Sequence, residues 1–324
     1  MCGAPDRCGK NVETGQVRET KNRGLFHASA GRNMRPKGRK GGDGMAEYQA
    51  GFIGCGNMGS VLAAAAAKSG ARIAAADHHP EKTEALVRKC GAAALDSAGA
   101  VAENSAFLFL GVKPQAMPAL ADEIRAVLDR RSGLPGRSGR FVLVSMAAGV
   151  SMEAVARRFG GPVGTPDNCP IIRIMPNTPA AVGEGVILYC ASGAVTGTEE
   201  AAFRDLLQEA GQVVKIDEGK MDAASAVTGC GPAFTCLFVE GMIDGAVRCG
   251  LPRAMAEKFV LQTVLGTAKL ALETEQDPAL LRGAVCSPAG STIAGVAALE
   301  ERSVRFAAME AVRAAWERTR ELGA

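Results

Sequence analysis

The sequence predicts an α/β fold in which a doubly wound parallel sheet is followed by an all-helical unit. Three observations support this expectation. From about residue 47 to residue 217, short apolar runs alternate with helix-like windows, and alternation of this length indicates a parallel sheet. The runs are apolar throughout, which is typical of strands covered on both faces. After residue 217 these runs cease, and helical windows separated by Gly and Pro follow.

The individual elements follow from the same pattern. We expect an α/β domain over residues 45–217 and an all-helical domain over residues 218–324. The clearest strands are expected at 50–54, 71–76, 106–112 and 141–145, and the runs at 171–175, 185–191 and 212–217 extend the sheet. Helices are expected at 57–69, 80–90, 114–130 and 151–159 in the first domain, and at 220–249, 253–275, 278–284, 291–300 and 303–322 in the second.

Composition narrows the class of protein. With 324 residues, 47% of them hydrophobic, the chain is long enough for a sizeable core and two domains. No run of 18 uncharged apolar residues occurs, so no membrane span is expected. The ten cysteines form neither a CxxC pair nor a Cys/His metal spacing. They are expected to be buried, reduced residues of a cytoplasmic protein, and no metal site is expected.

Charge is distributed unevenly along the chain. The net charge is +3, but residues 1–44 contain ten Lys/Arg and four Asp/Glu, against 27 and 30 in the remainder. The mildly acidic globular part argues against a nucleic-acid surface. Residues 1–44 lack the apolar core of a secretory signal. We expect them to form a disordered basic extension, with a tail for RNA or membrane, or a targeting peptide, as the alternatives.

A glycine-rich turn follows the first expected strand. In the run Gly54-Cys55-Gly56-Asn57-Met58-Gly59, Gly54 permits the tight turn, Gly56 lets a pyrophosphate approach the backbone, and Gly59 permits close packing of helix on strand. The helix that follows offers free N–H groups and the positive end of its dipole. GxGxxG at the first strand–helix turn of a βαβ unit predicts a Rossmann-type dinucleotide site, and a plain glycine turn is the weaker alternative.

The second strand ends at Asp77, 18 residues after Gly59. A carboxylate at this position accepts hydrogen bonds from ribose hydroxyls and repels a 2′-phosphate, which favours NADH. His78 follows, and when protonated it counters that repulsion. The alternative is that Asp77 only caps the helix that begins at Pro80.

Two later strands end at the same expected edge of the sheet, where doubly wound folds bind ligands. Val112-Lys113-Pro114 ends one strand, and small residues around Ala147 follow another and leave room for a flat ring. Lys113 is a candidate catalytic cation, although a lone Lys at a strand end more often meets solvent.

Two turns carry more Gly and Pro than plain connections need. In Met175-Pro176-Asn177-Thr178-Pro179 two prolines fix the backbone around an amide and a hydroxyl, which favours a ligand contact. Thr228-Gly229-Cys230-Gly231-Pro232 interrupts a helix, where Gly and Pro cost about 1 and 3 kcal/mol. Close approach of another backbone or of a cofactor ring is one explanation, and a structural kink is the alternative.

Near the C-terminus, Ser287-Pro288-Ala289-Gly290-Ser291-Thr292 opens a helix with hydroxyls and no charge. Together with FIGCGNMG, VKPQ, RIMPNTP followed by VGEG, and TGCGPAF, this run resembles the pyrroline-5-carboxylate reductase family, in the family's order over about residues 50–322. The resemblance implies reduction of 1-pyrroline-5-carboxylate to L-proline with hydride from NADPH or NADH. It further implies a Rossmann-type domain and a helical domain that interlocks with that of a second subunit, in dimers that often assemble into rings.

The resemblance also assigns residues. It implies that the turn at 287–292 holds the substrate carboxylate, with side-chain contacts from Ser287 and Thr292 and backbone N–H groups from Gly290 and Ser291, and that Thr292 is a candidate hydrogen-bond donor to the ring nitrogen. Such a turn neutralises an anion without a cation. The loop and the nucleotide are expected to meet across the dimer interface. The residues implied to line the nicotinamide region are Lys113, Pro114, Ala147, Asn177 and Pro232.

Departures from the family pattern occur at five places, one of which is Ser291, where the family has a small residue or Thr. Ala289 replaces a Gly, so the loop is strained if this position has positive φ. Cys230 and Phe234 stand where Ser and Tyr are usual, and Asp77-His78 stands where many members have a neutral polar residue and an Arg suited to a 2′-phosphate. We therefore expect retained activity, with NADH used better than is typical.

Three alternatives remain open. A 2-hydroxyacid or β-hydroxyacid dehydrogenase with a catalytic Lys is disfavoured because no Lys lies between Lys220 and Lys258. An imine reductase for another cyclic imino acid would use the same carboxylate loop. A non-catalytic dinucleotide-binding module predicts degraded substrate residues, whereas Ser287 and Thr292 are present.

Overall fold

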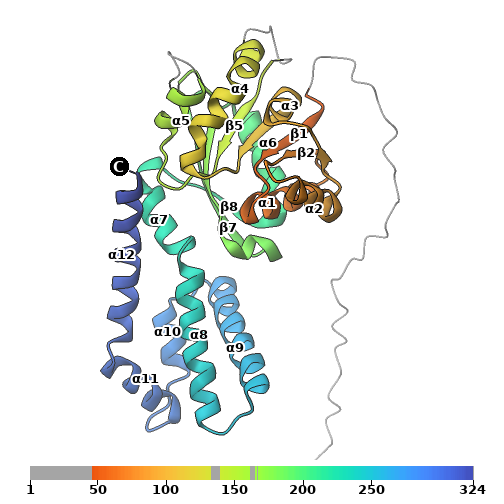
Figure 1. The fold of residues 1–324 in the computed structure, drawn as a ribbon. Helices are drawn as coiled ribbons and strands as arrows, with labels where there is room; N and C mark the ends of the chain where they lie inside the picture. The colour runs from red at the N-terminus through yellow and green to blue at the C-terminus, as the bar shows by residue number, and fades with distance from the viewer. Residues whose placement is uncertain (1–45, 133–138, 161–164, 166, 324) are drawn as a thin grey trace, which may run out of the picture. The chain divides into compact units, whose positions relative to one another are not determined.

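The computed structural model describes residues 46–132, 139–160, 165 and 167–323, and the extension expected over 1–44 lies outside the described residues. The first domain is built on an eight-stranded sheet (Figure 1). Its strand order is β3-β2-β1-β4-β5-β6-β7-β8. The strands are β1 (Tyr48–Ile53), β2 (Ile73–Ala76), β3 (Ala93–Ala94), β4 (Ser105–Leu110), β5 (Val142–Ser145), β6 (Ile171–Met175), β7 (Gly185–Ala191) and β8 (Gly211–Lys215).

The strand directions confirm the doubly wound α/β fold and add one reversal. Strands β1 to β6 are parallel to one another, and β8 is parallel to β7. The β6–β7 pair is antiparallel, with Met175 opposite Leu188. The carboxyl ends of the first six strands therefore lie at one edge of the sheet, and those of β7 and β8 lie at the other.

Helices cover both faces of the sheet (Figure 1). Helix α1 contacts α2 and α6, and α4 contacts α3 and α5. Helices α3 and α6 are additions to the expected elements: each is short, but Ser97 caps α3 and a Thr196–Glu199 capping box begins α6. The helices of this domain are α1 (Asn57–Lys68), α2 (Pro80–Cys90), α3 (Ala98–Asn104), α4 (Met117–Ser132), α5 (Met152–Phe159) and α6 (Gly197–Leu207), with 3-10 turns η1 (Pro114–Ala116), η3 (Thr178–Val182) and η4 (Gln208–Ala210).

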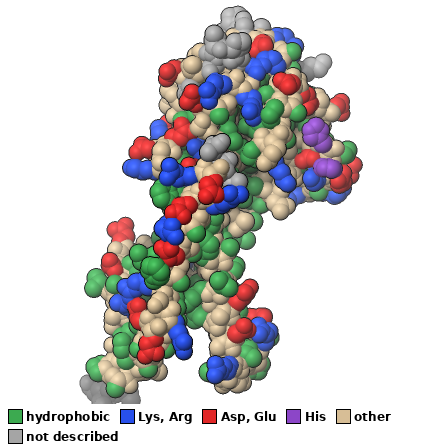
Figure 2. Space-filling model, turned by 60° about the vertical axis from the view of Figure 1, so that its left-hand side comes forward, with side chains coloured by type: hydrophobic (Ala, Val, Ile, Leu, Met, Phe, Trp, Pro, Cys, Tyr) green, Lys and Arg blue, Asp and Glu red, His purple; other side chains and the backbone are tan. Residues whose placement is uncertain are grey.

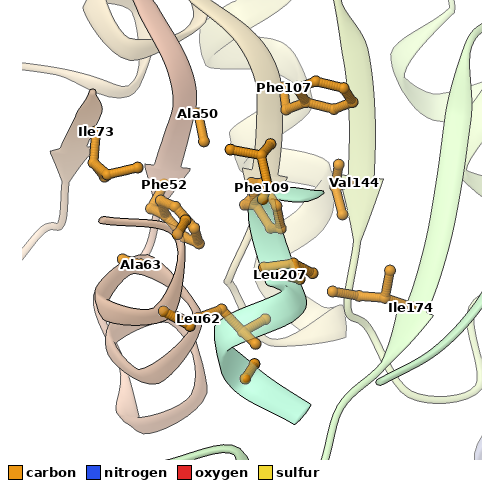
Figure 3. Close-up of a cluster of buried hydrophobic side chains, with 14 of the residues drawn as sticks. Ala50, Phe52, Leu62, Ala63, Ile73, Phe107, Phe109, Val144, Ile174 and Leu207 are labelled. Carbon is orange, nitrogen blue, oxygen red and sulfur yellow. The ribbon is translucent and has the colours of Figure 1, made fainter. Parts of the chain in front are cut away.

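Alternating side chains of the strands form two separate cores. Phe52 of β1 joins the cluster drawn in Figure 3, whereas the next residue, Ile53, joins the cluster on the opposite face. This is the two-residue period of a strand buried on both sides. In the first cluster the rings of Phe52 and Phe109 stack with their centroids 4.3 Å apart, and Leu62 of α1 and Leu207 of α6 belong to the same cluster. The packing fixes β1, and hence the turn that follows it.

After β8 the described chain is helical. The stretch expected as one helix over 220–249 is two helices separated at Gly229-Cys230. The elements are η5 (Glu218–Lys220), α7 (Met221–Thr228), α8 (Gly231–Arg248), α9 (Arg253–Thr274), α10 (Pro278–Ala284), α11 (Ser291–Glu301) and α12 (Val304–Gly323).

The C-terminal helices bury little of their apolar surface within one chain. Val239, Ile243, Ala256 and Val260 form a small core between α8 and α9. Many large apolar side chains nevertheless remain exposed on α8 to α12, as Figure 2 shows for one face. An exposed apolar area of this extent marks an interaction surface.

Candidate active site

The glycine turn lies between β1 and α1, as the sequence predicts. Gly54 has φ +102° and donates its N–H to the Ala76 carbonyl at 2.9 Å. A Cβ at Gly54 would lie 2.6 Å from the carbonyl oxygen of Gly111, which ends the neighbouring strand. Both the backbone angle and this close approach require glycine.

Gly56 and Gly59 have different physical roles. A Cβ at Gly59, inside α1, would lie 2.4 Å from the carbonyl oxygen of Gly54, so this glycine lets helix and turn pack together. Gly56 has φ −65° and ψ −176°, which any residue adopts, and a Cβ there would meet no atom within 4 Å. The packing of the chain gives no reason for glycine at 56, and an approaching ligand does.

The N-terminus of α1 is open to an anion. Gly56 is its N-cap, no side chain caps it, and its first turn holds no acidic residue. Asn57 is exposed and Met58 is half-buried. Free N–H groups and the positive end of the helix dipole suit a phosphate. These residues therefore fit the pyrophosphate of a dinucleotide.

Asp77 lies at the carboxyl end of β2 and is tied to the glycine turn. Its Oδ2 accepts the N–H of Cys55 at 2.7 Å, and its Oδ1 accepts the N–H of His79 at 2.9 Å. Each carboxylate oxygen keeps a further lone pair for a ribose hydroxyl. His78 is exposed beside it, and Nδ1 of His79 lies 3.6 Å from Glu81. The carboxylate thus both anchors the turn and presents negative charge.

The other strand-end residues lie at the same edge of the sheet. Lys113 is exposed directly after β4, between half-buried Val112 and Pro114. Ala147 is buried two residues after β5. Because β1, β4 and β5 are parallel neighbours, their carboxyl ends are adjacent.

Asn177 does not present its amide to solvent. Its side chain is 8% exposed, Oδ1 accepts the N–H of Val186 at 2.8 Å, and Nδ2 donates to the Thr228 carbonyl at 3.0 Å. The amide therefore joins two backbone segments. Its predicted place beside the nicotinamide remains a prediction, as does that of half-buried Pro232.

The turn at 287–292 precedes α11. Gly290 N donates to the Ser287 carbonyl at 3.0 Å, and Ala289 has φ +58°. Pro at the second position and positive φ at the third make a type II turn, which prefers glycine where this chain has Ala289. Gly290 is the N-cap of α11, without a side-chain cap. The turn thus opens onto unprotected N–H groups, beside the exposed side chains of Ser287 and Thr292.

We expect Ala289→Gly to stabilise the protein by about 1 kcal/mol, because alanine pays for the left-handed conformation and glycine does not. The measurement is the midpoint of urea unfolding at fixed protein concentration. Ala298→Gly, inside α11, is the control and should lower stability by about 1 kcal/mol. A lower midpoint for Ala289→Gly would contradict the strain.

The structure brings together the residues predicted to bind the nucleotide and leaves the turn at 287–292 apart from them. In the described part of the chain, no hydrogen bond or ion pair joins residues 287–292 to the turn at 54–59 or to Asp77. Ser287 and Thr292 are exposed within one chain. This is the arrangement expected when the two halves of a site come from different subunits.

Two residues that support the glycine turn are additional to the predicted set. A Cβ at Gly111 would lie 2.6 Å from the Gly54 carbonyl oxygen, and Ser60 Oγ donates to the Cys55 carbonyl at 2.8 Å. Gly111 stands directly before Val112-Lys113-Pro114, and this position beside a predicted site segment is the sequence feature that could have identified it. Burial raises the pKa of the Cys55 thiol, so it stays protonated at neutral pH.

The described residues hold no metal cluster and one long apolar helical stretch. Within them, no group of three or more His, Cys, Asp or Glu side chains is placed to hold a metal ion. One helical stretch there, Glu218–Arg248, is long and apolar enough to cross a membrane by length and composition, although Gly229-Cys230 divides it. Such a stretch is weak evidence for a membrane span.

Fold and site define the class: a dinucleotide-dependent oxidoreductase with a Rossmann-type domain. Residues 49–133 match the family model described as NADP oxidoreductase coenzyme F420-dependent. Residues 218–322 match the model described as pyrroline-5-carboxylate reductase dimerisation. That second match covers the helices whose apolar side chains are exposed.

The relatives specify the family. A pyrroline-5-carboxylate reductase from Synechocystis is 45% identical over 223 residues, which are 68% of this chain and 77% of that protein. The Escherichia coli enzyme of the same name is 36% identical over 280 residues, 85% of this chain and 98% of that protein. This chain therefore belongs to the pyrroline-5-carboxylate reductase family.

Solved structures agree with this assignment. Plasmodium falciparum pyrroline carboxylate reductase with NADP bound superposes with a TM-score of 0.73 at 30% identity, over 86% of this chain and 100% of that one. The pyrroline-5-carboxylate reductase of Coxiella burnetii gives a TM-score of 0.75 at 28% identity, over 86% and 99% of the two chains. The Rossmann-type sheet followed by helices is thus the fold of the family.

Proposed function

We propose that this chain reduces 1-pyrroline-5-carboxylate to L-proline with hydride from NADPH or NADH, the final step of proline biosynthesis. The observation that carries the proposal is the neutral type II turn at Ser287–Gly290 leading into the uncapped N-terminus of α11. A carboxylate fits this turn, and the cyclic imine attached to it needs only a hydride and a proton. The family assignment supports the same reaction.

The chain's own residues position the reactants. The N–H groups of Ser291 and Thr292 and the hydroxyls of Ser287 and Thr292 hold the substrate carboxylate. The N–H of Gly290, predicted to contribute with that of Ser291, donates instead to the Ser287 carbonyl. When its one hydroxyl proton points to the ring nitrogen instead, Thr292 donates a hydrogen bond to the neutral imine, which makes the C=N carbon more electrophilic towards hydride. The turn at 54–59 and Asp77 hold the nucleotide, which when bound supplies the hydride. Catalysis then rests on orientation more than on acid–base groups.

The domain division belongs to the proposal. Residues 45–217 bind the nucleotide, and residues 218–324 bind substrate and form the dimer, in agreement with the dimerisation match over 218–322. Two chains interlock through their C-terminal helices, so that the turn of one meets the nucleotide of the other, and dimers assemble further into rings. The eight described cysteines are free, as in a protein of the reducing cytoplasm.

We expect Thr292→Ala to raise KM for the imine and to lower kcat/KM about tenfold, the value of one hydrogen bond to a charged group. Dinucleotide affinity, measured by fluorescence titration, should stay nearly unchanged. Thr274→Ala is the matched control, because Thr274 Oγ1 donates only to the Leu270 carbonyl of its own helix. Unchanged imine kinetics in Thr292→Ala would refute the assignment of the turn.

Substrate profiling separates this function from its alternatives. The wild-type protein should turn over the five-membered 5-carboxylate faster than a six-membered homologue or the 2-carboxylate isomer. Faster turnover of another ring would make the chain an imine reductase of that substrate. Dinucleotide binding without turnover of any cyclic imine would show that the protein is a non-catalytic dinucleotide-binding module.

For the cofactor, we expect NADH to give the higher kcat/KM, because the anchored Asp77 carboxylate repels a 2′-phosphate. His78→Arg should shift the kcat/KM ratio about tenfold towards NADPH by a charge-assisted hydrogen bond. His79→Arg is the control, since its ring faces Glu81. A strong NADPH preference of the unmodified protein, in kinetics and in binding of the two nucleotides, would contradict the role of Asp77.

A further inference from the structure

The break between α7 and α8 leaves a backbone carbonyl without its helical donor. In a continuous α-helix the Thr228 carbonyl would accept the N–H of residue 232. That residue is Pro232, which has no N–H. Gly229 and Cys230 form a turn at this point, and α8 begins at Gly231. The Thr228 carbonyl therefore needs another partner.

Asn177 supplies that partner from a different part of the fold. Its Nδ2 donates to the Thr228 carbonyl at 3.0 Å, across 51 residues of sequence. Its Oδ1 accepts the N–H of Val186, at the start of β7, at 2.8 Å. Because the side chain is 8% exposed, water does not readily replace either bond.

The N-terminal end of α7 is held by β6, the strand that precedes Asn177 in the chain. Arg173 of β6 is 4% exposed, and its Nη2 lies 3.1 Å from Oδ1 of Asp222 in the first turn of α7. Its Nη1 lies 3.3 Å from Oε1 of Glu218, which also accepts the N–H of Met152 at 2.7 Å. Arg173 of β6 thus binds the N-terminal end of α7, and Asn177 in the turn after β6 binds its C-terminal end.

We propose that Asn177 is a positioning residue whose amide replaces the hydrogen bond that Pro232 removes, and so fixes the break at 228–232 against the turn that follows β6. Its role for the reaction rests on the proposed function, in which Pro232 lines the nicotinamide region. Asn177 then acts through the break, by setting where the C-terminal helices leave the first domain. It need not touch the cofactor.

The test is a double-mutant cycle on unfolding, which uses no substrate. Asn177→Ala should lower Tm by about 5 °C, because the carbonyl of half-buried Thr228 loses its donor and the N–H of Val186 loses its acceptor. In a Pro232→Ala background residue 232 regains an N–H, so the same substitution should cost clearly less. Asn177→Asp keeps an acceptor for Val186 and puts a carboxylate oxygen opposite the Thr228 carbonyl in place of the donor, so it should lower Tm at least as much. Equal losses in both backgrounds would overturn the proposal.

A kinetic readout separates positioning from general destabilisation. In Asn177→Asp, kcat should fall about tenfold, since small displacements of reacting groups are costly, while NADH affinity changes less than twofold. Asn104→Ala is the matched control: Asn104 Nδ2 donates to the Ala100 carbonyl inside α3, so its loss should affect Tm without affecting kcat. An unchanged kcat in Asn177→Asp would refute the positioning role. Absence of imine turnover in the wild-type protein would refute only the proposed function, since the unfolding cycle stands without it.

Discussion

Gly56→Ala is expected to fold normally and to lose dinucleotide affinity by about 100-fold, which corresponds to about 2.8 kcal/mol. The backbone angles at Gly56 suit alanine, and the added methyl group would meet no protein atom within 4 Å. It would instead occupy the space through which a pyrophosphate reaches the N-terminus of α1. Fluorescence titration with NADH and NADPH measures the affinity, and thermal unfolding without nucleotide measures the stability.

Two neighbouring substitutions make this result interpretable. Gly59→Ala should fail to fold or lose most of its stability, since its Cβ would lie 2.4 Å from the backbone oxygen of Gly54. Gly99→Ala in α3 should be harmless, because its nearest new contacts are side chains at 3.6 and 3.8 Å. If Gly56→Ala bound both nucleotides as tightly as the wild-type protein does, the pyrophosphate would have to lie elsewhere.

Leu265→Glu is expected to convert the oligomer into monomers and to abolish imine reduction. Leu261, Leu265 and Leu272 of α9 are 56%, 58% and 71% exposed and lie on one side of the helix. A carboxylate in the middle of this stripe would have to be buried without a partner in a dimer, at a cost of several kcal/mol. Analytical ultracentrifugation reports the mass, and the imine assay reports the activity.

The control for this substitution lies on the same helix. Thr267→Glu introduces the same charge at an exposed residue that lies about 160° around the helix from Leu265. It should keep the oligomer. NADH affinity should survive in Leu265→Glu, because the nucleotide-binding turn is complete within one chain. An active monomer would overturn the proposal that each site needs two subunits.

The geometry of the glycine turn and the position of Asp77 were predictable because their signals are local. A glycine turn between strand and helix, and a carboxylate at the next strand end, fix backbone positions through angles and close approaches that only certain residues allow. Strain at Ala289 was likewise predicted for the case of a positive φ, because the family that the sequence resembles has glycine at this position. The structure bears out that condition with φ +58°.

The remainder depended on tertiary contacts between distant segments. The sequence shows an amide at Asn177 and a proline at 232. Only the fold shows that Nδ2 of Asn177 donates to the carbonyl of Thr228, which Pro232 leaves without a donor. The direction of β7 was equally hidden, because an apolar strand reads the same whether it is parallel or antiparallel to its neighbour. Helix α6 was the avoidable omission, since Thr196 and Glu199 form a recognisable capping box.

The reversal at β7 determines the route by which the chain leaves the sheet. Since β8 ends at the edge opposite the carboxyl ends of β1 to β6, the chain has to return along the sheet to reach the edge where we propose that the nucleotide binds. Helix α7 makes this return. The eight residues of α7 span about 12 Å. This length is close to the distance of about 13 Å that four extended steps of the chain cover from Arg173 to Asn177. Helix α7 is therefore a spacer of set length: one residue more or fewer would turn its far end by about 100° and break one of its two attachments.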